Sequence, residues 1–487
     1  DPATRPLRRR TKAPAIGLAV AMLLAACSSD SSDTEPSTMA GEPPAETDVD
    51  IDPGDEPEAD DAVETDDDSG ADDDPAALPA DSADPDTVPG IYDDRILGAD
   101  IWDDELRILS ANMGFDGVIG WPNEEFDTIL AGGGSYFQPD CSDDPIISGA
   151  TATRVENLFR GVADDTPDYD DGLPIVFTWP VLTSTVHPED FLFTLNNGDQ
   201  VVPNSVGMVP NYELNERNTI VAFGDFGNRL EGEEALYVER LEIVDDGTPL
   251  TFLGPDGEQS GVGLTWDGGG SPYDTGPTLV GAKLNAVGDE AVGEGGVQVL
   301  DQPLIPNDEF ALYGGGDYRL RMLTSGGLTP TGITGLTPDA YEDHFVVHAT
   351  AADGSTVLLT EVGVDYEVAG GTLRVLGLAD LGRPEGGPVA YDFCYAEDVD
   401  NQIDIILAGD EAAARSITHV EVPAEGDYLP LYNPGGPGPE PFPDVRYTAP
   451  SPPDLEPVII ALDDPMRVSN VDSSVNATAT VAADGEI

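Results

Sequence analysis

The sequence predicts a mainly β protein, built from antiparallel β-sandwich domains with a few short helices and preceded by a disordered acidic linker. Three observations predict it. Short runs rich in β-branched and aromatic residues recur from about residue 166 onward, bounded by clusters of Gly, Asp, Asn and Pro. The Asn-Gly and Asp-Gly pairs in LNNGDQ and AADGST favour hairpin turns. Residues 28–90 are strongly acidic and contain no Lys, Arg or aromatic residue.

The first 26 residues have the layout of a secretory signal. Arg5, Arg8, Arg9, Arg10 and Lys12 precede the apolar stretch APAIGLAVAMLLAA. A basic region followed by a short apolar region is typical of such a signal. The apolar stretch is shorter than the roughly 20 residues that a transmembrane helix needs. We therefore expect a signal peptide over residues 1–26 and export of the rest of the chain.

The residues that end this stretch, Leu24-Ala25-Ala26-Cys27, resemble the lipobox of bacterial lipoproteins. The resemblance implies lipidation of the Cys27 sulfur, cleavage before Cys27 and acylation of the new amino group. It implies a lipid membrane as a partner and places the protein on the extracytoplasmic face of the bacterial cell membrane. Two or three acyl chains give stable anchoring where one chain does not. The alternative is an ordinary signal peptide with a cysteine there by chance.

Residues 27–90 are expected to form a tether after the lipidated cysteine. A segment with so little apolar surface has no core to offset the entropy lost on folding. Mutual repulsion among its carboxylates extends the chain. The tether would hold a folded domain away from the lipid surface, and the alternative is a spacer with no role of its own.

The charge of the chain restricts its partners. It has 95 Asp and Glu against 20 Lys and Arg, a formal net charge of −75 at pH 7. Nucleic acid and anionic membrane surfaces are therefore poor partners, whereas salt or bound Ca²⁺ would reduce the self-repulsion. A general compositional bias of the organism also explains this charge.

Two cysteines remain if Cys27 carries lipid. An even number of cysteines in an exported chain indicates a disulfide, here between Cys141 and Cys394. Two buried free thiols are the alternative.

Four regions are expected after the tether. They are a mixed N-terminal segment at 91–165, a β-sandwich at 166–275, a second β domain at 276–430, and a Pro/Gly-rich arm with a loose tail at 431–487. Within the first region, WDDELRILSANM (102–113) and NEEFDTILAGG (123–133) have the composition of short helices. A third helical window, GDEAAARS, covers 409–416.

Residues 176–206 are similar to the opening of bacterial Ig-like domains of the S-layer type. The pattern consists of Pro180-Val181, Ser184-Thr185-Val186, Pro188, Asp190-Phe191 and Thr194-Leu195. The resemblance implies an Ig-like sandwich with a structural or adhesive role, and it brings no catalytic residues.

One acidic cluster is a candidate calcium site. Asp398, Asp400, Asn401 and Asp404 supply hard oxygen ligands within a few residues, and Ca²⁺ takes six to eight such ligands. The spacing is not that of an EF-hand, because Ile403 stands where that loop needs Gly. The alternative is a solvated acidic turn. Ca²⁺ is the one cofactor that the sequence suggests.

The histidines give a weaker indication of a metal site. His344 and His348 would share one face of a strand, with Asp343 or His419 as a third ligand. Four residues along a strand span about 13 Å, too far for one ion. Surface or cross-strand histidines are therefore the favoured interpretation.

Motifs of catalysis are missing from the sequence. It contains no Gly-x-Ser-x-Gly elbow, no Walker loop and no dinucleotide fingerprint. We therefore expect no catalytic residues, and a non-enzymatic binding, adhesive or structural role toward an envelope polymer or another surface protein. The alternative is a secreted hydrolase on a β scaffold, for which a dependence on Ca²⁺ is one option.

Overall fold

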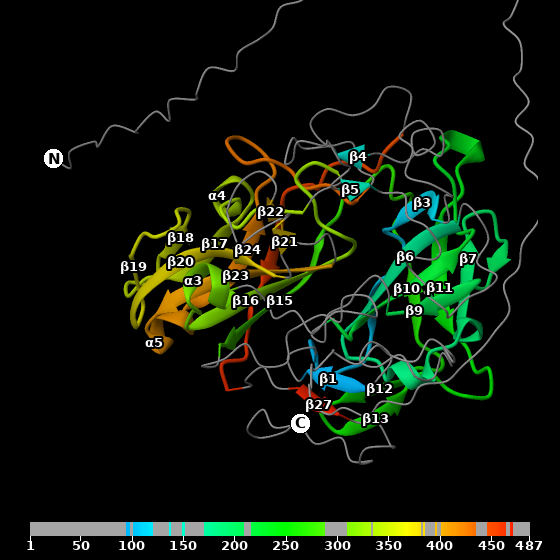
Figure 1. Ribbon diagram of the computed structural model, residues 1–487, viewed down its shortest axis with the longest axis horizontal. Coiled ribbons are helices and arrows are strands. Elements are labelled where there is room, and N and C mark those ends of the chain that lie inside the picture. Colours follow the sequence, from blue (N-terminus) through cyan, green and yellow to red (C-terminus); the bar gives the residue numbers. More distant parts are fainter. Residues whose placement is uncertain are drawn as a thin grey trace, which may run out of the picture. The chain divides into compact units, whose positions relative to one another are not determined.

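The described part of the chain is mainly β, as predicted, and most of its paired strands run antiparallel (Figure 1). All described residues belong to the unit 78–487. In this computed structural model the described residues are 94–97, 101–119, 136–137, 149–150, 170–208, 216–287, 309–332, 335–380, 383–384, 395–396, 401–434, 446–463 and 468–470.

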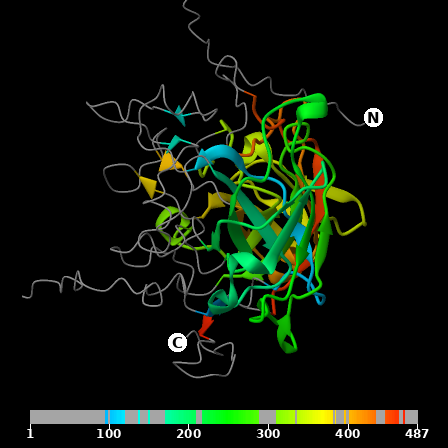
Figure 2. The ribbon, with the colours of Figure 1, turned by 90° about the vertical axis from the view of Figure 1, so that its right-hand side faces the viewer.

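Two antiparallel sheets share the first hydrophobic core, which gathers side chains between Leu106 and Phe252 (Figure 2, cyan to green). One has the order β2-β6-β10-β9, with β3 also paired to β6, and the other has the order β14-β11-β7-β8. β7 alternates buried and half-buried residues, as a strand with one face on a core should. The strands are β2 (Ile108–Ser110), β3 (Phe115–Ile119), β6 (Asp170–Phe177), β7 (Phe191–Leu195), β8 (Gln200–Val201), β9 (Ser205–Gly207), β10 (Thr219–Gly224), β11 (Val238–Ile243) and β14 (Thr265–Asp267).

Two antiparallel sheets are the coarse feature that the Ig-like resemblance implies, and the Ig-like topology itself stays a prediction. The hairpin of β12 (Thr251–Gly254) and β13 (Gly257–Ser260) extends from this core. The turn predicted at LNNGDQ joins β7 to β8, and Gly198 has a φ of 90° that favours glycine there.

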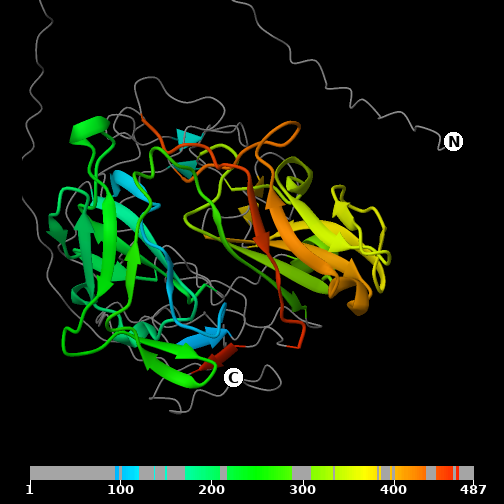
Figure 3. The same ribbon diagram turned by 180° about the vertical axis from the view of Figure 1, so that it is seen from behind.

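The second core lies between a six-stranded sheet, β19-β20-β23-β16-β15-β26, and a four-stranded sheet, β18-β17-β24-β25 (Figure 3, green to red). β15 and β26 form a parallel pair. The predicted AADGST turn joins β17 to β18, with Gly354 at a φ of 84°. The strands are β15 (Leu279–Ala286), β16 (Tyr318–Thr324), β17 (Val346–Thr350), β18 (Thr356–Leu359), β19 (Tyr366–Val368), β20 (Gly371–Ala379), β23 (Gln402–Gly409), β24 (Ile417–Val422), β25 (Asp454–Pro457) and β26 (Ile459–Ile460).

The remaining elements are short. The helices are α3 (Glu309–Tyr313), α4 (Tyr341–His344) and α5 (Glu411–Ala414), and the 3-10 turns are η3 (Thr183–Thr185), η4 (Pro188–Asp190) and η5 (Gly232–Glu234). The short strand pairs are β1 (Arg95–Leu97) with β27 (Val468–Asn470), β4 (Tyr136–Phe137) with β5 (Gly149–Ala150), and β21 (Arg383–Pro384) with β22 (Tyr395–Ala396). α5 lies inside the helical window predicted at 409–416.

The helix that the composition of 102–113 favours does not form. Ile108 and Ser110 instead pair with Phe177 and Val176 of β6, so pairing with a buried strand outweighs local helix propensity. Trp102 packs against Val176 of β6 and Leu323 of β16. This segment therefore contacts both the sheet that contains β6 and the sheet that contains β16. The other candidate helix, at 123–133, lies outside the described residues.

Candidate functional site

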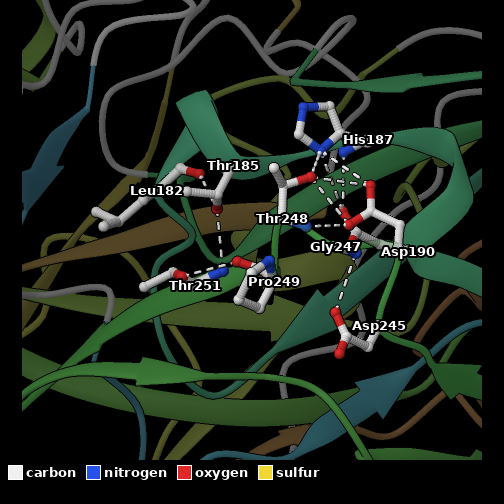
Figure 4. Close-up of polar contacts among 10 residues, drawn as sticks. Leu182, Thr185, His187, Asp190, Asp245, Gly247, Thr248, Pro249 and Thr251 are labelled. Atoms are coloured by element: carbon white, nitrogen blue, oxygen red, sulfur yellow. Dashed lines mark hydrogen bonds and ion pairs between the residues drawn. The ribbon is translucent and has the colours of Figure 1, made fainter.

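Polar side chains converge where η4 leads into β7, beside the loop 244–250 that joins β11 to β12 (Figure 4). The Val244 N–H donates to the Asp190 carbonyl oxygen at 2.8 Å, which ties the loop to the 3-10 turn. The sequences involved are His-Pro-Glu-Asp at 187–190 and Asp-Asp-Gly-Thr at 245–248. The site therefore joins two segments that lie more than 50 residues apart in the chain.

The first segment folds back on itself because of its proline and its terminal aspartate. Pro188 occupies the first position of η4, where its missing N–H and fixed φ are tolerated. The Asp190 N–H donates to the His187 carbonyl oxygen at 3.1 Å, and Asp190 Oδ2 accepts from the His187 N–H at 2.9 Å. This reciprocal pairing turns the Asp190 carboxylate back toward His187, while Phe191 is buried in the first core.

The loop segment is shaped by two aspartate turns. Asp245 Oδ1 accepts from the Gly247 N–H at 3.0 Å, and Asp246 Oδ1 accepts from the Thr248 N–H at 2.6 Å. Gly247 has a φ of 108°, a conformation that favours glycine. The Thr248 hydroxyl lies 2.9 and 3.0 Å from the two Asp246 oxygens. These turns hold the Asp246 carboxylate and the Thr248 hydroxyl next to the imidazole of His187.

Three donor groups meet at the centre of the site. His187 Nδ1 lies 3.4 Å from Asp246 Oδ2 and 4.0 Å from Asp190 Oδ2. One ligand atom from each residue lies within 4.8 Å of the others. The Thr248 hydroxyl is 3.1 Å from the same Nδ1, and Figure 4 shows His187, Asp190 and Thr248 pointing toward one another. One nitrogen and two carboxylates at this spacing are a donor set that a divalent cation can use.

The two carboxylates differ in their surroundings. Burial raises the pKa of Asp190 to about 6, and the nearby charge of Asp246 raises it further. The His187 N–H, the His187 imidazole and the Leu250 N–H act in the opposite direction, because they favour the charged form. The pKa of Asp246 is lowered, chiefly because its carboxylate accepts a hydrogen bond from the Thr248 N–H. The Asp190 side chain is 0% exposed, and its Oδ1 has no partner at hydrogen-bonding geometry in the described part of the chain, although the Leu250 N–H lies close enough to favour the charged form. A buried carboxylate oxygen without a partner is energetically costly.

Comparison with known proteins adds no relative. The sequence matches no protein-family model, no curated protein and no solved structure. The roles of these residues therefore have to be argued from their own geometry. In the described segments, every helix falls short of the length and apolar character needed to cross a bilayer.

The predicted calcium ligands are only partly described. Asp398 and Asp400 lie outside the described residues, as do Cys27, Cys141 and Cys394. The Asn401 amide donates to the Thr324 carbonyl oxygen at 3.1 Å. Asp404 accepts two hydrogen bonds from Arg321, and Arg319 Nε lies 3.2 Å from its Oδ2. A carboxylate surrounded by two guanidinium groups is a poor cation ligand, so the described half of the cluster lends the calcium prediction no support.

The histidines follow the favoured interpretation in part. His344 ends α4 and is buried, with Nδ1 3.1 Å from the Leu429 carbonyl oxygen, and burial lowers its pKa. It therefore does not share a strand with His348. His348 lies opposite His419 in the register of β17 and β24, and its Nε2 is 2.6 Å from Glu421 Oε2. These are cross-strand histidines, as expected.

A pocket elsewhere in the first core is mainly apolar. Leu173, Phe226, Val238 and Tyr273 contribute to its lining, together with Asp171. Asp171 Oδ2 accepts hydrogen bonds from the backbone N–H groups of Phe226 and Gly227 at 2.7 and 3.1 Å. The one carboxylate in the lining of this pocket thus has a structural role. The pocket is better suited to bind an apolar group than to catalyse a reaction.

The site at His187 was not predicted from the sequence. Asp190 stood out only as part of the Ig-like pattern, and Asp246 did not stand out at all. A local signal exists, because a proline between a histidine and an aspartate three residues later favours a single turn that brings both side chains together. Nothing local indicates which of 95 acidic residues completes the group.

Proposed function

We propose that the chain is a lipid-anchored protein on the extracytoplasmic face of the bacterial cell membrane, with a non-enzymatic binding, adhesive or structural role. The observation that carries the proposal is the order of basic region, short apolar region and Leu24-Ala25-Ala26-Cys27, followed directly by an acidic segment. Lipidation at Cys27 gives the chain a membrane partner, and the segment up to residue 90 supplies reach. The charge disfavours nucleic acid.

The outer face of the four-stranded sheet supports a binding role. Leu358 and Leu455 are large apolar side chains that are 46% and 49% exposed. Leu358 lies opposite His348 and Leu455 opposite Glu421 in the strand registers, so both project from the face that carries the cross-strand histidines. Exposed apolar side chains framed by polar groups are typical of surfaces that contact a neighbour. An envelope polymer or another surface protein is the partner we expect.

Fractionation of bacteria that express the full chain tests the anchor. We expect the wild-type chain in the membrane fraction, released by detergent, with an acylated N-terminal peptide that begins at Cys27 in mass spectrometry. The Cys27→Ala chain should lose the acyl groups and leave the detergent-released fraction. Recovery of the wild-type chain from the soluble cytosol with an unmodified Cys27 would refute the proposal.

Binding and turnover test the role itself. The full chain should sediment with isolated cell envelopes, and the Leu358→Asp/Leu455→Asp chain should sediment less. The same double change at Leu230 and Val262 is a matched control. These residues are 50% and 41% exposed, respectively, and lie in the part of the chain that builds the first core. The same protein should not turn over ester, glycoside or peptide substrates.

The second candidate function is a secreted hydrolase. It is favoured by the proximity of the Asp190 and Asp246 carboxylates, whose nearest ligand oxygens lie within 4.8 Å. Retaining glycosidases place two carboxyl groups about 5–5.5 Å apart. Against this reading, the Asp190 side chain is 0% exposed, so a substrate as large as a glycan does not contact it in this structure. Turnover that is lost in both Asp190→Asn and Asp246→Asn would favour the hydrolase.

A further inference from the structure

We propose that His187, Asp190 and Asp246 bind one divalent transition-metal ion of the zinc class. The ligand atoms are His187 Nδ1 and one oxygen from each carboxylate, which already lie within 4.8 Å of one another. This site does not depend on the lipid anchor or on the outer sheet face, so it stands or falls separately from the proposed function.

The burial of Asp190 is the independent observation that points to a ligand. Its side chain is 0% exposed and faces His187 and Asp246, and its Oδ1 has no partner at hydrogen-bonding geometry among the described residues. Buried carboxylates are normally paired with a cation or fully hydrogen-bonded. Within the described residues the basic group that lies beside Asp190 is the His187 imidazole, at 4.0 Å. A bound cation would neutralise this buried carboxylate.

The donor types select the class of ion. An imidazole nitrogen with two carboxylates suits zinc and its first-row neighbours, whereas calcium takes six to eight oxygen ligands. Two atoms 3.4 Å apart, as His187 Nδ1 and Asp246 Oδ2 are, subtend about 108° at an ion with bonds of about 2.1 Å. That angle is close to tetrahedral. The Asp190 carboxylate would have to move toward the ion, because its Oδ2 lies 4.0 Å from His187 Nδ1.

Thr248 has a positioning role in this site. Its hydroxyl lies within hydrogen-bonding distance of both Asp246 oxygens, and its N–H donates to Asp246 Oδ1. Partners of this kind orient a ligating carboxylate and leave its other lone pairs for the ion. Because the ligands come from η4 and from the loop 244–250, the ion would cross-link two segments of the folded state. Binding to the folded state alone raises the thermal unfolding temperature.

The experiment has to distinguish this site from a second group of side chains that could bind zinc. His348, His419 and Glu421 also lie together, with imidazole ring centroids 6.3 Å apart. The three cysteines of the chain are further zinc ligands. The protein for the test is therefore the full chain with its thiols alkylated and its metals removed by a chelator. A large excess of Mg²⁺ suppresses weak binding to the many surface carboxylates.

Calorimetric titration with Zn²⁺ then tests the proposal. We expect one strong site per chain, a rise in the unfolding temperature on Zn²⁺ addition, and neither effect with Ca²⁺. The changes His187→Gln, Asp190→Asn and Asp246→Asn should each weaken Zn²⁺ binding by at least about tenfold, since loss of an outer partner alone costs about that much. In Asp190→Asn the side-chain oxygen can still accept from the His187 N–H, so the turn should persist.

Two matched controls decide between sites. Asp245→Asn changes the neighbouring acid, whose carboxylate accepts from the Gly247 N–H outside the ligand group, and should leave Zn²⁺ affinity unchanged. His348→Gln should also leave it unchanged. Circular dichroism of the metal-free variants verifies their folding. Absence of a strong site in the wild-type chain overturns the proposal, as does Zn²⁺ affinity that survives all three ligand changes or is lost in His348→Gln.

Discussion

Asp404 and Arg321 lie opposite each other on the neighbouring strands β23 and β16 and form a buried two-pronged ion pair on the face of their sheet that points away from the second core. Arg321 Nε and Nη2 each donate to one Asp404 oxygen at 3.0 Å, and both side chains are 1% exposed. Arg319 joins the group between Asp404 and Glu309, with Nη2 2.5 Å from Glu309 Oε1. The acidic chain thus uses two of its few arginines to neutralise buried carboxylates.

Removal of one partner of this ion pair should be strongly destabilising. Asp404→Asn leaves Arg321 buried with a neutral partner, and we expect unfolding in urea at pH 7 to lose about 3–5 kcal/mol. The double change Arg321→Met/Asp404→Leu should recover much of this loss, because both charges are then removed. Asp365→Asn is the control, since Asp365 pairs with Arg374 at the surface and such pairs are worth about 1 kcal/mol or less. Equal losses in Asp404→Asn and Asp365→Asn would contradict this account.

Glu456 should make stability fall as the pH rises. This residue of β25 lies opposite the buried Val420, and burial, with the charge of Asp454, raises its pKa to about 7 from 4.5. Between these two values the folded chain holds a proton here that the unfolded chain releases, so the contribution is full below pH 4.5 and is lost through pH 7. Because the group is only half-buried, we expect a loss of about 1–2 kcal/mol.

The measurement is urea unfolding of the wild-type and Glu456→Gln chains from pH 4.5 to 8 at constant salt. The two should be similarly stable at pH 4.5, and the Gln variant should be the more stable at pH 8. Glu258→Gln, at an exposed position of β13, should show no such pH-dependent difference from the wild-type chain. A constant difference between wild-type and Glu456→Gln at all pH values would show that this carboxyl does not titrate as described.

Local sequence patterns predicted strands and turns. The features that they did not predict depend on contacts between residues far apart in the chain. The alternation in β7 and the glycines of the two hairpins act over a few residues, so the sequence indicates them directly. By contrast, Asp404 looked like a calcium ligand because acids cluster near it, and its real partner Arg321 is 83 residues away.

The site at His187 was beyond prediction for the same reason. Thr248 lies 61 residues from His187 in the chain, and long-range contacts such as the pairing of β7 with β11 bring their segments together. In a chain with 95 acidic residues, proximity to a histidine in sequence carries little information. The burial of Asp190, which only a few of the described acids share, is a property of the packed fold and has no local signature.

The predicted disulfide between Cys141 and Cys394 is open to a direct test. Both residues lie outside the described segments, so the pairing rests on the even number of cysteines left after Cys27. Exported chain that is denatured without reduction should take up no thiol reagent at either residue, and reduction should add two labels. Labelling of both cysteines before reduction would reject the bond.

Replacement of Gly254 should destabilise the first core through Trp179. A Cβ at Gly254 would lie 2.4 Å from a carbon of the Trp179 ring, well inside contact distance. The indole has little freedom to move, because it is 5% exposed and its Nε1 donates to the Asp103 carbonyl oxygen at 2.7 Å. Overpacking of this kind costs about 1–3 kcal/mol.

We therefore expect Gly254→Ala to lower the free energy of unfolding by that amount and to change the near-ultraviolet dichroism of the tryptophans. Gly269→Ala is the matched control, because a Cβ there meets no atom within 4 Å and should be nearly neutral. A further change of Trp179 to Phe should relieve much of the strain of Gly254→Ala, since the smaller ring frees the space that the new methyl group needs. If the two glycine variants were equally stable, or if Trp179→Phe gave no relief, then contact between β12 and this indole would not limit the packing of the core.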